Sequence, residues 1–507
     1  MSLSGFKGSR SRIGLPQADV ESGDKTGQWF SLDGECSFSV RLDSDRAIMS
    51  GVPDLDVSAA ARPRIMIDGA QFLSAQATGM GSYARTLANT LSSSGCSVSI
   101  LYGRPMIGDR SNLPMALSSQ VFGKTPLPNP FEKLTAAASK WLGARSPFRS
   151  SVKPIEICPV GVDFASTEPP VPLGDRIYNV DKLYDLAAYR FITRQGLTEV
   201  RFGNTVDLAH WTGPVAVKAK GCPNVYTIHD LIPMQYPHFV LDRGGRAAKI
   251  HSAIAREADM LITVSEASKQ AIVELLHVPP ERVHVTYQPT PPLPTLAQEE
   301  CERFVQTVYG VKPGGYAIFL GAIEPKKNLK RLIEAFVMAA PPGFPLLIAG
   351  PLGWMYEADV QLIELITRNI TKHQFESPVQ QLGFLPRLHV SALLKCARFM
   401  AFPSICEGFG LPVLEAMQMG VPVLTSNTSS LPEVAGDAAV LVDPLSVTAI
   451  SEGIRQLAND SDLRSTLITR GHLQAAKFGR EIYIGRLREA YAKVGVHLPC
   501  RIPEGAA

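Results

Sequence analysis

Two glutamates, Glu407 and Glu415, lie in and just after a glycine-rich turn with seven residues between them. The residues before the turn, 397–402, are mostly apolar and of strand length, and a helix is expected to follow. Gly408 and Gly410 would let backbone N–H groups approach an anion, and the N-terminus of the helix adds a partial positive charge. Carboxylates also accept hydrogen bonds from sugar hydroxyls. The stretch therefore predicts a site for a nucleotide-sugar.

The segment from Pro403 to Met417 resembles the Glu-x7-Glu signature of the retaining glycosyltransferases called family 4 (glycosyl transferases group 1), which have the GT-B fold. An ordinary strand–turn–helix with surface glutamates is the alternative for the short pattern alone. The resemblance implies that Glu407 holds hydroxyls of the donor sugar and takes part in catalysis. It also implies a set of donor-binding positions, namely Gly408, Phe409, Gly410, Leu411 and, for the ribose hydroxyls, Glu415.

A second segment, 321–328, is similar to the Gly-x-x-x-Pro-x-Lys-Asn segment of the same family. Lys327 precedes a run with apolar residues at helical spacing, so its ammonium group would lie beside a helix N-terminus suited to phosphate. The resemblance implies a catalytic role for Lys327 on the donor diphosphate. Many relatives carry arginine where this chain has Ala322, and Lys326 is the candidate to replace that cation.

The N-terminal half contributes His229, which follows the apolar run 224–228. In an open parallel sheet, residues just beyond the carboxyl end of a strand line the ligand crevice. A single histidine there is more often structural, but the block resembles the family's His-Asp segment, whose histidine borders the reacting sugar. Gly79 and Gly81 resemble the family's N-terminal glycine loop, which closes over the donor phosphates before a helix expected from Tyr83.

Strand and helix patterns alternate on both sides of the proline-rich stretch 288–294, which predicts an α/β protein of the GT-B class, with two doubly wound Rossmann-like domains facing a cleft. We expect the following parts: a partly disordered N-terminal extension (1–62), an acceptor-side domain (63–295) with an insertion at about 103–203, a nucleotide-sugar-binding domain (296–479), and a C-terminal crossing helix and tail (480–507).

Composition narrows the class of protein. With 45% hydrophobic and 19% charged residues and a net charge of +3, the chain is typical of a folded globular protein and gives no case for nucleic-acid binding. Its apolar runs are shorter than the roughly 18 residues that span a membrane, and its N-terminus lacks the apolar centre of a secretory signal. We expect a cytoplasmic protein. The basic, aromatic segment 131–149 leaves peripheral contact with the inner membrane face open, although a solvated loop is the simpler interpretation.

No metal and no cofactor are expected, because the eight cysteines show no metal-like spacing. The triplets Asp43-Ser44-Asp45 and Asp54-Leu55-Asp56 match the Asp-x-Asp pattern with which GT-A enzymes hold a metal. Such triplets are common in solvated turns.

These features predict transfer of a hexose-type sugar, with mannose as one candidate, from a nucleotide-sugar to a glycan or lipid-linked acceptor in cell-surface polysaccharide synthesis. Retention of the anomeric configuration is implied by the family resemblance alone. Three alternatives stay open: a GT-B epimerase acting on free nucleotide-sugars, a phosphorylase that would need a pyridoxal-phosphate lysine, and a non-catalytic scaffold with this fold.

Overall fold

The structure is a computed structural model that describes residues 62–72, 79–104, 151–157, 174–194, 196–239, 245–290, 293–294, 296–371 and 377–499. Arg62–Ala507 form one compact unit. Both Asp-x-Asp triplets and the segment 131–149 lie outside the described residues.

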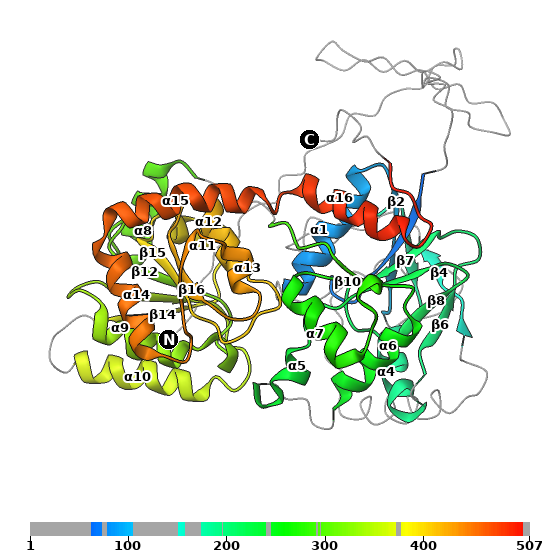
Figure 1. Cartoon of the computed structure of the whole chain (residues 1–507), viewed down its shortest axis with the longest axis horizontal. Helices are drawn as coiled ribbons and strands as arrows, with labels where there is room; N and C mark the ends of the chain where they lie inside the picture. Colours follow the sequence, from blue (N-terminus) through cyan, green and yellow to red (C-terminus); the bar gives the residue numbers. More distant parts are fainter. Residues whose placement is uncertain are drawn as a thin grey trace, which may run out of the picture. The chain divides into compact units, whose positions relative to one another are not determined.

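The first sheet has eight strands in the order β11-β10-β9-β7-β1-β2-β5-β4 (Figure 1). Neighbouring strands are parallel except β4 and β5, which are antiparallel. The strands are β1 (Arg64–Asp68), β2 (Ser97–Tyr102), β4 (Ile155–Ile157), β5 (Arg176–Asn179), β7 (Leu208–Trp211), β9 (Asn224–Thr227), β10 (Met260–Thr263) and β11 (Val283–Val285). A separate parallel sheet has the order β3-β6-β8 and joins Ser151–Val152, Thr198–Arg201 and Val217–Lys220.

The helical segments of this half are α1 (Gly79–Ser93), α4 (Leu183–Arg194), α5 (Ile232–Gln235), η4 (Pro237–Phe239), α6 (Arg246–Glu257), α7 (Glu266–Leu276) and η5 (Pro280–Arg282). Because helices cover both faces, the central strands β7, β9 and β10 are buried at every position, and none shows the alternation of a strand with one exposed face. Helix α1 buries a single stripe that includes Tyr83, Leu87 and Leu91.

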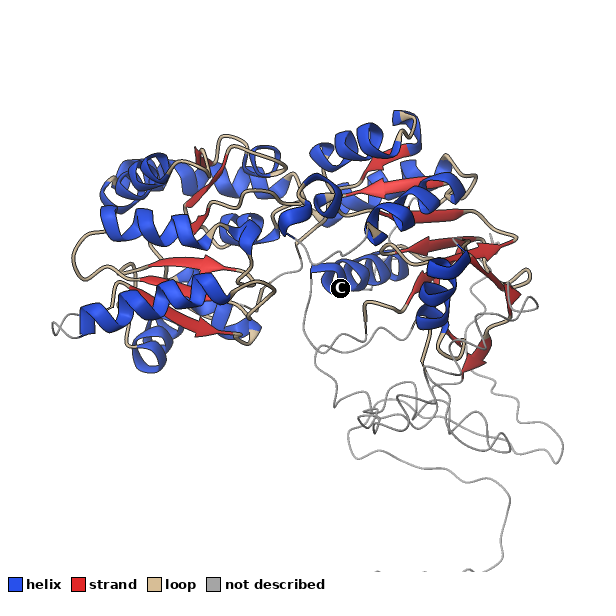
Figure 2. Cartoon of the chain, turned by 90° about the horizontal axis from the view of Figure 1, so that it is seen from below, coloured by secondary structure: helices blue, strands red, loops and turns tan. Residues whose placement is uncertain are grey.

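The second sheet has six parallel strands in the order β14-β13-β12-β15-β16-β17. Its strands are β12 (Ala317–Leu320), β13 (Leu346–Ala349), β14 (Val379–Gly383), β15 (Phe399–Phe402), β16 (Val423–Ser426) and β17 (Ala439–Val442). Its helical segments are α8 (Gln298–Tyr309), η6 (Pro325–Lys327), α9 (Leu329–Ala339), α10 (Glu357–Thr371), α11 (Arg387–Lys395), α12 (Leu411–Gln418), α13 (Leu431–Ala435), α14 (Val447–Asn459) and α15 (Ser461–Ala476). Figure 2 shows the red strands of both sheets between layers of blue helices.

Each large sheet reverses its strand order at one place. In the first sheet, β2, β5 and β4 lie on one side of β1, whereas β7, β9, β10 and β11 lie on the other. In the second sheet, β13 and β14 lie on one side of β12, and β15, β16 and β17 lie on the other. At such a switch point the loops after the two central strands lead in opposite directions and leave a crevice for ligands. The β1/β7 and β12/β15 edges are therefore the places to look for functional groups.

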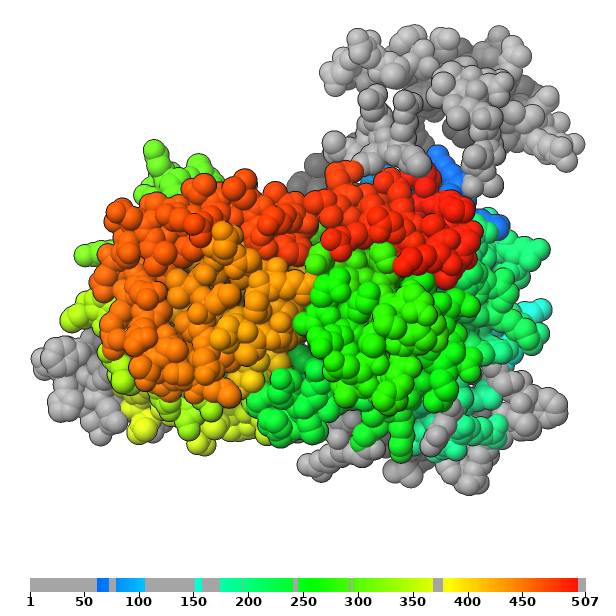
Figure 3. All heavy atoms as spheres, viewed as in Figure 1, coloured from blue at the N-terminus to red at the C-terminus, as the bar shows by residue number. Residues whose placement is uncertain are grey.

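The last helix, α16 (Arg480–Ala492), packs on elements of the first sheet. A guanidinium nitrogen of Arg480 donates to the carbonyl of Asn89 in α1 (3.1 Å), and Arg486 donates to the carbonyl of Val285 in β11 (3.2 Å). Figure 3 shows α16, in red, at the molecular surface. Within the described ranges, no helix is both long enough and apolar enough to span a membrane.

The predicted doubly wound α/β class is confirmed by both sheets. Helix α1 begins at Gly79, so the prediction that it starts at Tyr83 was wrong: glycines are tolerated in a first turn, where N–H groups lack intrahelical partners anyway. The predicted insertion at 103–203 also contains regular elements that the sequence analysis missed, namely β3, β4, β5, α4 and β6. Its strands are two to four residues long, which is too short to show a periodic pattern.

Candidate functional site

A cluster of two lysines and two glutamates occupies the switch point between β12 and β15; below it is called the charged cluster. Lys327 Nζ lies 2.6 Å from Glu407 Oε1, and Lys326 Nζ lies 3.7 Å from Glu407 Oε2 and 3.6 Å from Glu324 Oε1. These side chains expose between 5% and 15% of their surface. Buried charges need partners of opposite sign, and here each finds one.

The lysines are positioned by the short turn after β12. Pro325 opens the 3₁₀ segment η6, and Asn328 follows it with a left-handed backbone (φ 62°) just before α9. The Asn328 amide donates to the carbonyls of Pro403 (3.0 Å) and Pro444 (2.6 Å), which ties this turn to the loop after β15. Lys327 Nζ also lies 4.9 Å from the centre of the Phe402 ring, within range of a cation–π interaction. Asn328 is the last residue of the lysine segment 321–328, but its positioning role was not predicted.

Glu407 is positioned by hydroxyl groups from the loop after β16. Ser429 Oγ donates to the carbonyl of Glu407 (2.6 Å) and accepts from its N–H (3.1 Å). Ser430 Oγ lies within bonding distance of the carbonyls of both Phe409 (2.7 Å) and Glu407 (3.0 Å), and Thr428 Oγ1 donates to that of Ile405 (3.0 Å). The segment from Ser429 to Ala439 also resembles the family's segment after the second glutamate, but this positioning role was not predicted. The dense run of serine and threonine directly after an apolar strand was the available signal, since hydroxyls readily bond nearby backbone.

The two carboxyl groups of the cluster have pKa values shifted in opposite directions. Burial acts to raise the pKa of Glu407, but the positive charges of Lys327 and Lys326 outweigh it and the pKa is lowered. Burial raises the pKa of Glu324, and the lysines offset this only in part. Burial opposes the charge of Lys326, yet Glu407, Asp230 and Glu324 raise its pKa. Glu407 and Lys326 are therefore held in their charged forms.

Gly408 brings the loop after β15 against the loop after β9. A Cβ atom on Gly408 would lie 2.9 Å from the carbonyl oxygen of His229 and 3.0 Å from Asp230 Oδ2, so only glycine fits. Ser265 Oγ donates to the carbonyl of Gly408 (2.8 Å), and Ser268 Oγ lies within bonding distance of the carbonyls of both Gly408 (3.2 Å) and His229 (2.9 Å). Ser265, which also caps α7, thus helps to join the His229 loop to the Glu407 loop.

The side chain of His229 is held from two sides. Its Nε2 lies 2.9 Å from the carbonyl oxygen of Thr212, and its ring meets the ring of Tyr83 edge to face at 4.8 Å. Because a carbonyl can only accept, Nε2 carries the proton and Nδ1 is an acceptor in the neutral imidazole. Burial lowers the pKa of His229, which favours this neutral form.

Other predicted donor-binding residues shape the turn between β15 and α12. Gly410 has φ 119° at the N-terminus of α12, where a Cβ atom would lie 2.9 Å from Leu431 Cδ2, and Leu411 begins that helix. Phe409 is buried and contacts the rings of Tyr287 and Phe478. These residues fix the backbone that leads from Glu407 into α12.

Three predicted residues lie elsewhere. Gly81 is buried in the first turn of α1, and Gly79, at the start of that helix, has no atom within 4 Å of a Cβ position. Burial raises the pKa of the half-buried Glu415, and the charge of Arg387 offsets this only in part. Among the described residues, no hydrogen bond or ion pair joins Gly79 or Glu415 to the charged cluster.

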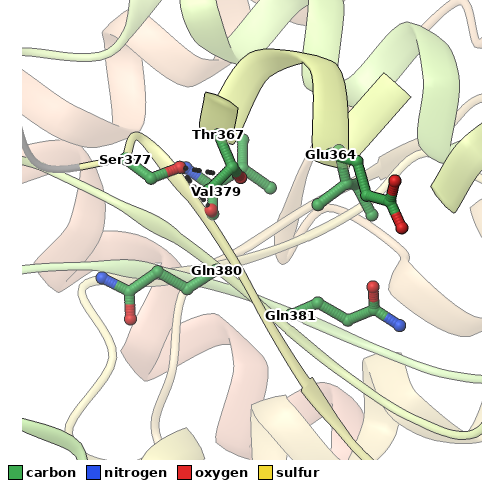
Figure 4. A pocket seen from close by; sticks show the side chains of 7 residues that line it. Glu364, Thr367, Ser377, Val379, Gln380 and Gln381 are labelled. Atoms are coloured by element: carbon green, nitrogen blue, oxygen red, sulfur yellow. Dashed lines mark hydrogen bonds between the residues drawn. The ribbon is translucent and has the colours of Figure 1, made fainter. Parts of the chain in front are cut away.

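A surface pocket lies away from these residues, beside β14 and α10 (Figure 4). Ser377 Oγ bonds there to Thr367 Oγ1 (3.3 Å) and to the carbonyl of Val379 (2.7 Å). None of the predicted site residues lines it. In the part of the chain that the structure describes, no group of three or more His, Cys, Asp or Glu side chains is placed to hold a metal ion.

Two family models match the chain. One, described as "Glycosyl transferases group 1", matches residues 310–474, which contain the charged cluster. The other, described as "Glycosyltransferase Family 4", matches residues 158–292, which contain His229.

Named relatives and solved structures agree with these models. O-antigen chain mannosyltransferase B of Escherichia coli is 35% identical over 268 residues, which cover 51% of this chain and 67% of that protein. The serotype-specific mannosyltransferase WbdA of Escherichia coli is 28% identical over 274 residues, covering 52% of this chain but only 33% of WbdA. The crystal structure of Anabaena Alr3699/HepE in complex with UDP and glucose has a TM-score of 0.54 at 16% identity, covering 85% of this chain and 100% of that one.

Two Rossmann-like halves, one of them with the charged cluster at the switch point of its sheet, define a protein of the GT-B fold. The family models and the mannosyltransferase relative narrow the class further. The chain belongs to the GT-B glycosyltransferases.

Proposed function

We propose that this protein is a retaining family 4 glycosyltransferase that moves a hexose, with mannose as the leading candidate, from a nucleotide-sugar to a glycan or lipid-linked acceptor in cell-surface polysaccharide synthesis. The observation that carries the proposal is the charged cluster at the β12/β15 switch point, in which Lys327 and Lys326 meet Glu407. Mannose and the polysaccharide setting rest on the names of the relatives, O-antigen chain mannosyltransferase B above all.

Cleavage of a nucleotide-sugar leaves a diphosphate, so the site must stabilise negative charge as the glycosidic bond stretches. Lys327, Lys326 and the N-termini of α9 and α12 supply fixed positive charge without a metal ion. In this proposal Glu407 holds both lysines in place and contacts hydroxyls of the sugar. Glu415 contacts the ribose, and Gly79 and Gly81 border the phosphates.

Retention follows from attack on the same face that the leaving group departs from. The bond from C1 to the phosphate oxygen breaks, the bond from C1 to the acceptor oxygen forms, and the acceptor proton passes to a phosphate oxygen. His229 borders the sugar, and burial keeps its imidazole neutral. In this proposal the protein works in the cytoplasm, with peripheral contact at the membrane if the acceptor is lipid-linked.

The proposal is tested by incubating the protein with a panel of GDP- and UDP-linked sugars and measuring nucleotide release with and without acceptor extracts. Acceptor-dependent release from one donor supports the transferase, and NMR of the product reports the anomeric configuration. Interconversion of the free donor would indicate the epimerase instead, and no turnover of any donor would indicate the scaffold. Transfer is expected to survive EDTA; loss of activity that Mg²⁺ or Mn²⁺ restores would contradict the metal-free mechanism.

A further inference from the structure

Tyr83 lies near the start of α1, and its side chain is fully buried. Its ring meets the ring of His229 edge to face, with the ring centres 4.8 Å apart and the ring planes at 88°. Its hydroxyl group bonds Thr227 Oγ1 (2.8 Å). Burial raises the pKa of this phenol to about 12, so the hydroxyl is neutral. Tyr83 therefore holds the segment that carries His229 at two points, by its ring and by its hydroxyl.

Both contacts fall on the same side of that segment. Thr227 ends β9, and His229 follows it by two residues. In an extended chain, residues two apart point to the same side. Tyr226, the neighbour of Thr227, points the other way and donates to the carbonyl of Val217 in β8. Tyr83 therefore covers the side of β9 from which the His229 side chain projects.

A buried chain of hydrogen bonds fixes Tyr83 in turn. Thr227 Oγ1 also lies 2.7 Å from Nε2 of His210 on β7, and Nδ1 of His210 lies 2.5 Å from the hydroxyl of Tyr491 on α16. Burial lowers the pKa of His210 to about 3, so its imidazole is neutral and has one donating and one accepting nitrogen. Hydroxyl groups can do either, so all three bonds of the chain form together. A fully satisfied buried network of this kind is rigid.

The His229 imidazole needs such a second contact. Its only printed polar anchor on the ring is the bond from Nε2 to the carbonyl of Thr212 (2.9 Å). One hydrogen bond fixes one edge of a ring but leaves the ring free to tilt about the bond. A second ring packed edge to face restricts this tilt. The two contacts together set the direction in which Nδ1 points.

We propose that Tyr83 is a positioning residue for His229, whose ring fixes the tilt of the imidazole and so the direction of Nδ1 toward a sugar hydroxyl. The proposal rests on the proposed function for the sugar, but not for the orientation of the imidazole. It assigns the role to the ring of Tyr83, whereas the hydroxyl chain keeps that ring in place. A tyrosine that only filled the core would affect stability and leave His229 unchanged.

Two substitutions of Tyr83 separate these possibilities. Tyr83→Phe keeps the ring, and Thr227 still bonds His210, so its buried hydroxyl keeps a partner. Tyr83→Leu removes the ring. We expect the kcat of Tyr83→Leu for transfer to be roughly 10- to 100-fold lower, because small misplacements of a group at the reacting centre are costly. The KM for the donor should change little, since positioning acts on the reacting complex. The kcat of Tyr83→Phe should stay close to that of wild type.

The matched control is Tyr178→Leu, on β5 of the same sheet. Tyr178 is also buried, bonds a threonine hydroxyl (Thr205 Oγ1, 3.4 Å) and meets an aromatic ring edge to face (Phe202, 5.4 Å). Its replacement should lower the free energy of unfolding, as in Tyr83→Leu, but leave kcat unchanged. An equal loss of kcat in the two leucine variants would show that kcat follows stability, and would overturn the proposal.

The orientation of His229 is measured without substrate, by NMR of protein labelled at histidine and tyrosine and assigned with His229→Gln. An aromatic ring shifts the signals of protons packed against it. The ring-proton signals of His229 should therefore move in Tyr83→Leu and stay near their wild-type positions in Tyr83→Phe and Tyr178→Leu. Unmoved signals in a folded Tyr83→Leu would contradict the positioning role.

The test does not depend on the folding of Tyr83→Leu. Wild type should show cross-relaxation between the ring protons of Tyr83 and His229, and its absence would overturn the proposal. A folded Tyr83→Phe with strongly reduced kcat would overturn it as well, because the ring would not be the part of Tyr83 that acts. If no donor is turned over but the expected signals are seen, the positioning role stands and the proposed function fails.

Discussion

The switch points of the two sheets have the same topology but opposite electrostatics. At β12/β15, Lys327 and Lys326 lower the pKa of the buried Glu407. At β1/β7, burial raises the pKa of Asp68 to about 6, and no cation of the described residues is among the groups that offset this rise. Burial acts on both carboxyl groups in the same direction, so nearby positive charge decides the outcome.

The difference suggests that the two sheet edges bind different parts of the donor. Under the proposed function, fixed charge of both signs suits the half that would hold a diphosphate, whose own charge is large. The neutral imidazole of His229 suits the half that would contact an uncharged sugar. The fold supplies two equivalent edges, and the side chains at each decide what it binds. Substitutions at each edge should therefore fail in different ways.

The largest effect on transfer is expected from Lys327→Ala, in the charged cluster at the β12/β15 edge (below, the charged edge). Removing a preorganised charge that stabilises the leaving group should lower kcat by roughly 100- to 1000-fold and lower kcat/KM equally. Lys330→Ala, on the exposed side of α9, is the matched control and should be close to wild type. Steady-state kinetics with the preferred donor checks this. A Lys327→Ala protein with wild-type kcat would show that the edge handles its leaving group by other means.

The next largest effects are expected from substitution of Glu407 and Glu415, which should change different kinetic constants. Loss of a charge-assisted hydrogen bond costs about 1.5–3 kcal/mol, so Glu407→Gln and Glu415→Gln should each reduce kcat/KM by roughly 10- to 150-fold. Because Glu407 contacts both lysines, Glu407→Gln should mainly lower kcat. Glu415 makes no such contact and is proposed to bind the ribose, so Glu415→Gln should mainly raise the KM for the donor. Circular dichroism confirms folding in each case. Equal effects on kcat would mean that both glutamates act at the charged edge.

The two edges also differ in how far the sequence could predict them. Lys327 and Glu407 belong to short local patterns whose rare charges stand out beside glycine and proline, and the ion pair between them follows from the parallel strands β12 and β15. Asp68 and Thr212 are 144 residues apart in the sequence, although their strands are neighbours in the sheet. The hydrogen bond between Thr212 and His229 uses a backbone carbonyl, which every residue has. No pattern of side chains reveals such a bond. The serines that hold the Glu407 loop differ in this respect: their partners are backbone atoms too, but the run of serine and threonine after β16 was a visible signal.

The groups near the β1/β7 switch point should also affect how the free energy of unfolding depends on pH. His210 on β7 is fully buried and bonds Tyr491 on α16 (2.5 Å) and Thr227 on β9 (2.7 Å), and burial lowers its pKa to about 3. An unfolded histidine binds a proton below about pH 6.5, whereas folded His210 does not. This residue alone should therefore remove about 1.4 kcal/mol of unfolding free energy per pH unit as the pH falls below about 6.

Asp68 has the opposite sign, because its raised pKa means that the folded state binds the proton first, so stability is gained as the pH falls from about 6 to 4. Urea denaturation at pH 7.5 and 4.5 should show His210→Gln losing less stability on acidification than wild type. Asp68→Asn should lose more. Tyr491→Phe, which removes a hydrogen bond but no titrating group of this range, should lower stability by a similar amount at both pH values. Parallel pH dependence in His210→Gln and wild type would contradict the assignment to His210.

The smallest effect concerns the missing arginine at Ala322. Lys326 Nζ lies 3.7 Å from Glu407, farther than Lys327 at 2.6 Å, and it is shared with Glu324. Lys326→Ala should therefore lower kcat by less than about tenfold, since a longer and shared ion pair contributes less. If Lys326 supplies the charge that arginine supplies in many relatives, Ala322→Arg should restore part of the loss in the Lys326→Ala background but add little to wild type. No restoration would mean that Lys326 serves to pair the buried Glu324 and Glu407, which would leave Lys327 as the cation of the charged edge that acts on the donor.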